Sequence, residues 1–272
     1  MNLSELLGSD RIRAAKWTIS EQRLVIEEVL GLVMVDQILR AQESLSREQI
    51  EKLLTIASRS QQGEPLAYIL GVVYFDGLRL GVTPDVLIPR LDTEILVAVA
   101  SELMQREDAM QVHDMCTGSG AVALALKSRY PRCEMSASDI CRNAIACART
   151  NAVSLKLDVQ FTRADLFDGL GMFDLVTANP PYVAWGDPEV EAAVIRYEPE
   201  QAVFSVANGL ALIEQLLTDA LNHLRVGGIL CLEHGHRQAH DVHLMASDLG
   251  WQAIKTYQDL AGRDRVTRMQ KP

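Results

Sequence analysis

The most informative stretch for the architecture of the carboxyl-terminal part of the chain is Val112-His-Asp-Met-Cys-Thr-Gly-Ser-Gly-Ala-Val-Ala-Leu124. A short strand, Val112–Met115, is expected to lead through a glycine loop directly into a helical run, Ala121–Arg129. Glycine lets a backbone approach a ligand closely, and the amino terminus of a helix carries a partial positive charge. The stretch therefore predicts a strand, a loop and a helix that together bind a nucleotide or a carboxylate.

Helical and strand patterns alternate around this loop from about Asp92 onward. The other expected helices and strands are Ile95–Met104, Glu134–Ser138, Asn143–Ala152, Val159–Thr162, Phe173–Ala178, Ala211–Leu224 and, after Gly227-Gly228, Ile229–Glu233, with one more helix and two more strands at the end. Such alternation predicts an α/β fold with a mostly parallel, doubly wound sheet. Ligands of these sheets bind beyond the carboxyl ends of the strands, at the switch point.

The first part of the chain has a helical pattern instead. Ser46 precedes Gln49 by three residues, which is a capping box, and an apolar face follows at Ile50, Leu53, Leu54 and Ala57. A second helix is indicated by Val25, Val29, Leu32 and Val33. Gly63-Glu64-Pro65 is expected to end the helical run.

A tight β-hairpin is predicted next, because two β-rich runs, Val72–Phe75 and Leu78–Val82, flank Asp76-Gly77. We therefore divide the chain into a helical domain over residues 1–71, a β-hairpin linker over residues 72–83 and an α/β domain over residues 84–272.

The composition excludes several classes of protein. Of the 272 residues, 48% are hydrophobic and 23% are charged, which is typical of a globular protein. A net charge of -10 argues against non-specific nucleic-acid binding. No apolar run approaches the roughly 20 residues of a membrane span, and the first residues do not resemble a signal peptide. The five cysteines form no CxxC pair, so we expect buried thiols in a cytoplasmic protein.

Two acidic residues follow later strands of the expected sheet. Asp139 lies 19 residues after Gly120 and could accept hydrogen bonds from both hydroxyls of a ribose. Asp165 ends the third strand and fits the amino group of an adenine. These features alone leave the cofactor open, because Gly118-x-Gly120-x-x-Ala123 also fits the dinucleotide fingerprint.

The tetrapeptide Asn179-Pro180-Pro181-Tyr182 follows the strand Phe173–Ala178. Two prolines make the turn rigid and remove two N–H donors. The side-chain oxygen of Asn179 and the carbonyl of Pro180 can then accept from one planar NH2 group, while Tyr182 packs against its plane. Two fixed acceptors favour positive charge on a weakly nucleophilic nitrogen, so the motif predicts methyl transfer to an amide or an aromatic amine.

With these motifs the chain closely resembles the HemK/PrmC N5-glutamine methyltransferases, which methylate the glutamine of the GGQ motif in class-I peptide chain release factors. The resemblance covers nearly the whole chain and lies in Gly63-Glu-Pro-Leu-Ala-Tyr-Ile-Leu-Gly71, Leu87-Ile-Pro-Arg-Leu-Asp-Thr-Glu94, Asp114–Gly120, Asn179–Tyr182, Tyr197-Glu-Pro199 and Asp259-Leu-Ala-Gly-Arg-Asp-Arg-Val266. It implies a class I S-adenosylmethionine-dependent methyltransferase, with a Rossmann-like sheet of seven strands, the last antiparallel, behind a small helical domain that docks the release factor.

The resemblance also implies roles for individual residues. S-adenosylmethionine would be bound by Cys116, Thr117, Gly118, Ser119, Gly120, Asp139, Asp165, Leu166 and Asn179. The glutamine amide would be held by Asn179, Pro180, Pro181 and Tyr182, of which Asn179, Pro180 and Tyr182 are the expected catalytic residues. Arg90, Thr93 and Glu94 are expected to line the site, with Arg90 and Glu94 binding substrate.

The chain departs from the family pattern in three places. Leu91 stands where proline is usual, Cys116 stands where glycine is common, and Ser205–Gly209 contains fewer glycines than the usual form.

Several alternatives remain open on the sequence alone. Adenine-N6 nucleic-acid methyltransferases share the motif Asn179–Tyr182, and ribosomal-protein glutamine methyltransferases are close relatives. A nicotinamide dehydrogenase or a non-catalytic cofactor-binding scaffold would share the glycine loop. No metal site is predicted, because His234, His236, His240 and His243 lack a carboxylate or cysteine that would complete a familiar ligand set.

Overall fold

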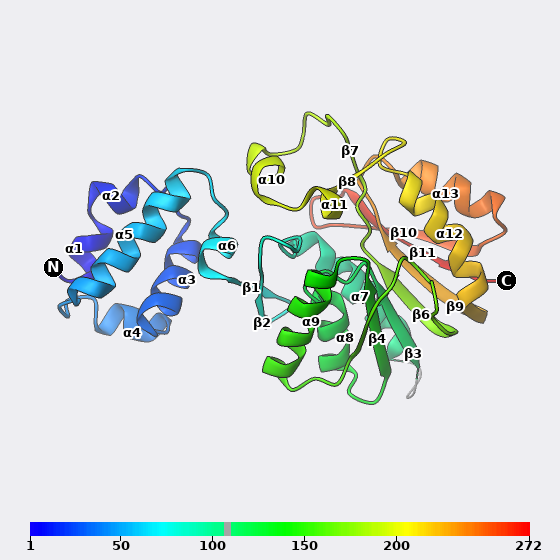
Figure 1. Ribbon diagram of the computed structural model, residues 1–272, viewed down its shortest axis with the longest axis horizontal. Coiled ribbons are helices and arrows are strands. Elements are labelled where there is room, and N and C mark those ends of the chain that lie inside the picture. Colours follow the sequence, from blue (N-terminus) through cyan, green and yellow to red (C-terminus); the bar gives the residue numbers. More distant parts are fainter. Residues whose placement is uncertain (106–109) are drawn as a thin grey trace. The chain divides into compact units, whose positions relative to one another are not determined.

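The computed structural model describes residues 1–105 and 110–272 (Figure 1). The chain forms two compact units. The first contains Met1–Val72 together with Ala192–Tyr197, and the second contains Val73–Glu191 and Glu198–Pro272.

The first unit is helical. Its helices are α1 (Leu3–Leu7), α2 (Asp10–Arg13), α3 (Ile19–Leu30), α4 (Met34–Leu39), α5 (Arg47–Gln61), α6 (Leu66–Leu70) and α10 (Ala192–Tyr197). The predicted capping box of α5 is present, with the amide of Gln49 donating to Ser46 Oγ at 3.1 Å. The apolar face of α5 packs Leu53 and Ala57 against Leu6 and Val25 in the core of this unit.

Three features of the first unit differ from the sequence-based expectation. Gly31 adopts a left-handed conformation and ends α3, so Leu32 and Val33 lie outside that helix. The helical run resumes as α6 after Gly63-Glu64-Pro65. The segment α10, far along the chain, belongs to this unit, and the Tyr197 hydroxyl donates to the carbonyl of Gln62 at 3.2 Å.

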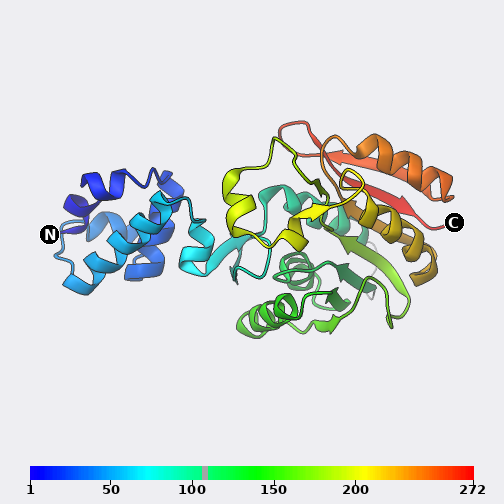
Figure 2. The same cartoon turned by 45° about the horizontal axis from the view of Figure 1, so that its top comes forward.

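The second unit is built on a seven-stranded sheet in the order β10-β11-β9-β6-β3-β4-β5 (Figure 2). Its strands are β3 (Gln111–Met115), β4 (Glu134–Asp139), β5 (Gln160–Arg163), β6 (Phe173–Ala178), β9 (Leu224–Glu233), β10 (Gln252–Gln258) and β11 (Asp264–Gln270). β11 runs antiparallel to both of its neighbours, whereas β9, β6, β3, β4 and β5 are parallel. The doubly wound sheet with an antiparallel last strand is therefore confirmed, and its switch point lies between β3 and β6.

Helices cover both faces of this sheet (Figure 1). One face packs against α7 (Glu94–Met104), α8 (Ala121–Arg129) and α9 (Arg142–Leu155), and the other against α12 (Ala211–His223) and α13 (Ala239–Asp248). The central strands β3 and β6 are therefore buried on both faces. The short elements η1 (Leu91–Thr93), β7 (Val183–Ala184), α11 (Glu200–Val203) and β8 (Phe204–Ser205) lie in connections between the larger ones.

The predicted hairpin consists of β1 (Val72–Phe75) and β2 (Leu78–Gly81). Asp76 and Gly77 have φ values of 50° and 77°, as a tight two-residue turn requires. The hairpin is more than a linker, because Phe75 and Leu80 are buried in the core of the second unit. The residues of the hairpin from Val73 onward therefore group with that unit.

The glycine pair before the fifth parallel strand also behaves differently from the expectation. Gly227 and Gly228 lie inside β9, which begins at Leu224, and the pairing of β9 with β6 has an irregular register between Phe173 and Leu175. A β-bulge can hold glycine within a strand in this way. None of the helices that the structure describes is long and apolar enough to span a membrane.

Candidate active site

The glycine loop joins β3 to α8 at the switch point of the sheet. Cys116, Gly118 and Gly120 have φ values of 57°, 55° and 84°. A Cβ atom on Gly120 would lie 3.1 Å from Ala148 Cβ, so glycine also permits the close packing of α8 on α9. Cys116 adopts the left-handed conformation with a side chain, which explains why glycine would suit this position.

Asp139, at the end of β4, accepts a hydrogen bond from the backbone of the glycine loop. One carboxylate oxygen accepts from the amide of Gly118 and the other from the amide of Cys141, both at 2.9 Å. Burial raises the pKa of Asp139, and these two hydrogen bonds oppose the rise. Because a carboxylate oxygen can accept two hydrogen bonds, each keeps capacity for a ligand hydroxyl.

Asp114, near the end of β3, binds the glycine loop through a side-chain hydrogen bond. It accepts hydrogen bonds from the hydroxyls of Thr117 at 2.6 Å and Thr177 at 2.7 Å. Burial raises its pKa to about 6. Cys116 is kept as a thiol, because burial and then the nearby carboxylates Asp139, Asp114 and Asp165 raise its pKa.

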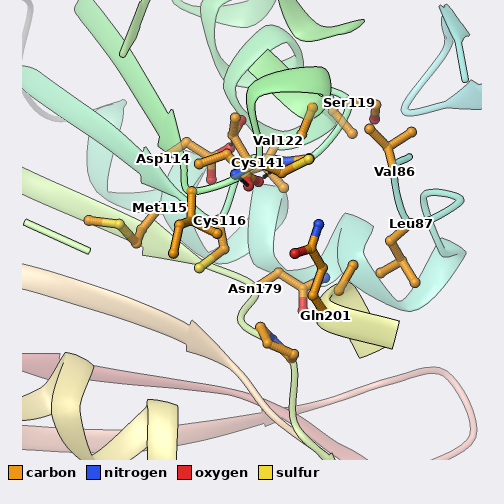
Figure 3. A pocket seen from close by; sticks show the side chains of 18 of the residues that line it. Val86, Leu87, Asp114, Met115, Cys116, Ser119, Val122, Cys141, Asn179 and Gln201 are labelled. Carbon is orange, nitrogen blue, oxygen red and sulfur yellow. Dashed lines mark hydrogen bonds between the residues drawn. The ribbon is translucent and has the colours of Figure 1, made fainter. Parts of the chain in front are cut away.

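A pocket opens at the carboxyl ends of β3, β4 and β6 (Figure 3). Of the expected site residues, it is lined by Cys116, Thr117, Gly118, Ser119, Asp139, Asp165, Leu166, Asn179, Pro181 and Thr93. Further lining side chains that sequence reasoning missed include Val86, Leu87, Ile140, Cys141 and Gln201. Figure 3 shows Asn179 and Gln201 on one side of the pocket and the glycine-loop residues on another.

The register of the sheet brings Asn179 beside the glycine loop. Met115 pairs with Ala178, so the residues that follow β3 and β6 emerge side by side. Asn179 Nδ2 donates to Thr93 Oγ1 at 3.2 Å. Among the described residues, no donor binds Asn179 Oδ1, so this oxygen can accept from a ligand.

Tyr182 lies outside the lining of this pocket and is fixed at both ends. Its hydroxyl donates to Glu233 Oε1 at 3.2 Å, and its carbonyl accepts from Gln238 Nε2 at 2.9 Å. The same Nε2 donates to the carbonyl of Asn208 at 3.0 Å, and the Gln238 oxygen accepts from the amide of Gly235 at 2.9 Å. Gln238 therefore ties the end of the Asn179–Tyr182 motif to two neighbouring loops.

Arg90 and Glu94 are not among the residues that line this pocket, contrary to our expectation. Arg90 pairs with the buried carboxylate of Glu198, and Glu94 accepts from the amide of Asp76 at 2.9 Å. Both side chains are thus used to hold their segment in place. Gly120 and Pro180 also lie outside the lining, and Gly120 acts through packing.

Glu233 is the principal titratable residue that the sequence analysis missed. It ends β9 and is 1% exposed, and burial raises its pKa to about 7. The signal that identified Asp139, an acid at the carboxyl end of a strand, applies equally to Glu233. Sequence reasoning also gave no role to Arg265 in β11, which forms ion pairs with Asp92 at 2.8 Å and with Asp259 at 3.0 Å.

The cysteines and histidines are placed differently from expectation. All five cysteines are free. Cys133 and Cys231 are fully buried, whereas Cys116, Cys141 and Cys147 are partly buried; Cys116 and Cys141 border the pocket, and Cys147 lies near the hairpin. His236 precedes α13, so it shares no helix face with His240. In the described parts of the chain, no three His, Cys, Asp or Glu side chains are grouped as metal ligands.

Comparison with known proteins identifies the relatives of this chain. Two family models match it, the Methyltransferase small domain over residues 91–200 and the PrmC N-terminal domain over residues 7–71. A solved structure of the T. thermophilus 16S rRNA N2 G1207 methyltransferase, in complex with AdoMet and guanosine, is similar with a TM-score of 0.53. It is 17% identical and covers 74% of this chain and 50% of that one, which supports the fold alone.

Curated sequences are much more similar. The release factor glutamine methyltransferase of Vibrio cholerae is 40% identical over 227 residues, covering 82% of this chain and 79% of the relative. The protein of the same name from Neisseria gonorrhoeae is 37% identical over 272 residues, covering 98% of this chain and 97% of the relative. The chain therefore belongs to the family of release factor glutamine methyltransferases.

Proposed function

We propose that this protein transfers a methyl group from S-adenosylmethionine to the side-chain amide nitrogen of the glutamine in the GGQ motif of class-I peptide chain release factors. The position of Asn179 carries this proposal. It follows β6, lies beside the glycine loop, donates to Thr93 and keeps its oxygen available at the pocket. The names of the relatives favour glutamine over adenine as the acceptor.

The residues around the pocket fit S-adenosylmethionine. The carboxylate of Asp139 keeps acceptor capacity for two ribose hydroxyls, and Asp165 would accept from the adenine amino group. Ile140 and Leu166 offer apolar surface for the adenine ring. When bound, the cofactor supplies a methyl group on a positively charged sulfonium.

The motif that begins at Asn179 would prepare the acceptor. An amide nitrogen is a poor nucleophile, since its lone pair is delocalised into the carbonyl group. The Asn179 oxygen and the Pro180 carbonyl would orient the NH2 group and stabilise the charge that develops on nitrogen. Tyr182, fixed by Glu233 and Gln238, would pack against the amide plane, and solvent would take the proton.

We assign docking of the release factor to the helical domain, over residues 1–71 in the division made from the sequence. The PrmC N-terminal model matches this region, and α4 carries Ile38 and Leu39 with 72% and 76% of their surfaces exposed. The proposed reaction belongs in the cytoplasm and needs neither a metal nor direct contact with nucleic acid.

Methyl-labelled S-adenosylmethionine tests this function. The protein is incubated separately with unmethylated release factor, with the same factor carrying Ala in place of the GGQ glutamine, and with adenine-rich DNA. Label on the native factor alone is expected, and Asn179→Ala should abolish it. Label on DNA alone would instead make the motif an adenine site.

Cofactor binding is tested apart from turnover. Calorimetric titration with S-adenosylhomocysteine should show weaker binding to Asp139→Asn, because an amide has one acceptor oxygen where the carboxylate has two. Asp174→Asn, which changes an acid at the opposite end of the sheet, is the matched control and should bind normally.

A further inference from the structure

Gln238 is a half-buried residue whose side-chain amide binds main-chain groups of three segments. Its Nε2 donates to the carbonyls of Tyr182 at 2.9 Å and Asn208 at 3.0 Å, and its Oε1 accepts from the amide of Gly235 at 2.9 Å. A main-chain carbonyl only accepts and a main-chain N–H only donates, so these partners leave one orientation for the Gln238 amide. Position 238 therefore requires a group that donates twice on one side and accepts on the other.

The backbone of Gln238 is itself held in place. Its N–H donates to the carbonyl of Gly235 at 2.9 Å, so Gly235 and Gln238 bind each other twice within one turn. Gln238 is also the N-cap residue of α13, and its carbonyl accepts from the amide of Val242 at 2.9 Å. A side chain that starts from such a turn can position the groups that it binds.

Two glycines leave room for the junction of Gln238 with Tyr182. A Cβ atom on Gly209 would lie 2.7 Å from Gln238 Nε2, and one on Gly235 would lie 3.0 Å from Gln238 Oε1. The loop that carries the Asn208 carbonyl is left-handed at Asn208, with a φ of 57°. A residue with a side chain keeps this conformation only where the surrounding structure restrains it. The hydrogen bond from Gln238 to the Asn208 carbonyl is such a restraint.

Tyr182 is held by hydrogen bonds at its two ends. Its hydroxyl donates to Glu233 Oε1 at 3.2 Å, and its carbonyl accepts from Gln238 at 2.9 Å. The first distance is long for an O–H···O hydrogen bond, whereas the second is typical of N–H···O. The hydrogen bond from Gln238 is therefore the stronger restraint on where Tyr182 lies.

We propose that Gln238 is a positioning residue that acts through Tyr182, fixing its carbonyl so that the aromatic ring lies against the acceptor amide. This inference rests on the proposed function, in which Tyr182 packs against the amide plane of the substrate glutamine. Neither Gln238 nor Tyr182 lines the pocket that would hold the cofactor. Gln238 thus influences the alignment of the acceptor and leaves cofactor binding unaffected.

Kinetics of Gln238 variants with unmethylated release factor test the inference. Gln238→Glu keeps the length of the side chain and an acceptor for Gly235, but it loses both N–H donors. Gln238→Met keeps a similar volume and loses the donors and the acceptor. Either change should lower kcat roughly tenfold to a hundredfold, because a small displacement of the acceptor is costly in rate. The affinity for S-adenosylhomocysteine should stay at the wild-type value.

Gln270→Met is the matched control. Gln270 Nε2 also donates to a loop carbonyl, that of Gly227, at 2.9 Å. Gln270 ends β11, whereas Val266 near the start of that strand pairs with Glu233. The control therefore removes the same kind of hydrogen bond at a position remote from Tyr182. It should lower the melting temperature, as the Gln238 variants do, yet leave kcat unchanged.

Two further measurements separate positioning from a general effect on the fold. Tyr182→Ala removes the ring through which Gln238 acts, so adding Gln238→Met to it should not lower kcat further. Hydrogen exchange requires no turnover. Residues 182–186 should exchange faster in Gln238→Met than in the wild type, and at the wild-type rate in Gln270→Met.

Wild-type kcat in Gln238→Glu, losses that multiply in the double variant, or unchanged hydrogen exchange in Gln238→Met would each overturn the inference. A loss of affinity for S-adenosylhomocysteine as large as the loss of kcat would also overturn it, since the effect would then lie on the cofactor. If the wild type labels DNA and no release factor, the proposed function fails instead. Kinetics of the same variants on DNA, together with hydrogen exchange, then decide whether Gln238 positions Tyr182.

Discussion

Gly209 offers a sharp test of how the Asn179–Tyr182 motif is held. Its φ is +82°, and a Cβ atom at this position would lie 1.9 Å from the carbonyl oxygen of Tyr182. The obstacle is backbone, which cannot rotate away as a flexible side chain can. We therefore expect Gly209→Ala to displace the end of the motif.

The size of the effect follows from the distance. A contact of 1.9 Å must open by about 1.1 Å to reach the 3.0 Å below which real Cβ contacts are essentially never found. A displacement of about 1 Å can cost roughly a hundredfold in rate. The positive φ adds about 1–2 kcal/mol of strain, and the overlap adds about 1–3 kcal/mol.

Gly250→Ala is the matched control. Its φ is +86°, yet nothing lies within 4 Å of an added Cβ atom, so Gly250→Ala introduces backbone strain but no steric overlap. At about 2–4 °C per kcal/mol, Gly209→Ala should melt several degrees below Gly250→Ala. Methyl transfer should fall about a hundredfold in Gly209→Ala only. Equal melting temperatures and equal activities in the two variants would show that the Tyr182 carbonyl does not restrict position 209.

Three further outcomes are expected. His113 is buried, and burial lowers its pKa to about 3, so the free energy of unfolding should fall by about 1.4 kcal/mol per pH unit as the pH drops below 6.5. In urea unfolding between pH 7 and 4.5, His113→Gln should lack this fall. If the free energy of unfolding of His113→Gln fell with pH as steeply as that of the wild type, the prediction would be contradicted. Arg90→Ala should destabilise the protein by about 1–3 kcal/mol, because it leaves the buried carboxylate of Glu198 without its cation. Arg40→Ala, which breaks an exposed pair, should leave the melting temperature unchanged, and equal shifts would count against the argument. Ala207→Gly should raise the melting temperature by about 1–2 °C, since it relieves a φ of 52°, and a decrease would show that chain entropy outweighs strain.

Elements with strong local signals were predicted closely. The strand Phe173–Ala178 and the helix Ala121–Arg129 match the structure at both ends. The turn at Asp76-Gly77 has the expected positive φ values. In each case the signal lies in neighbouring residues, whose periodicity and backbone freedom act over a few positions.

The limits of prediction appear where a contact joins distant segments. We expected Arg90 at the pocket, but it forms an ion pair with Glu198, which lies more than a hundred residues away along the chain. The helix at residues 192–197 packs with the first unit although it follows most of the sheet in sequence. No local pattern reports such pairings, because their free energy is gained only when the two segments meet.

Local patterns were sufficient to predict a helical part followed by an α/β part, the α/β alternation, the glycine loop and the motif that begins at Asn179, together with the family resemblance they support. These depend on side-chain periodicity, on turn residues and on short spacings along the chain. The tertiary structure was needed to show that Asn179 donates to Thr93, that Glu233 accepts from the Tyr182 hydroxyl, and that Gly209 packs closely against the Tyr182 carbonyl. The reason is physical: strand register and helix packing set which strand ends lie side by side, and burial then sets the charge and hydrogen-bond direction of the groups that meet there.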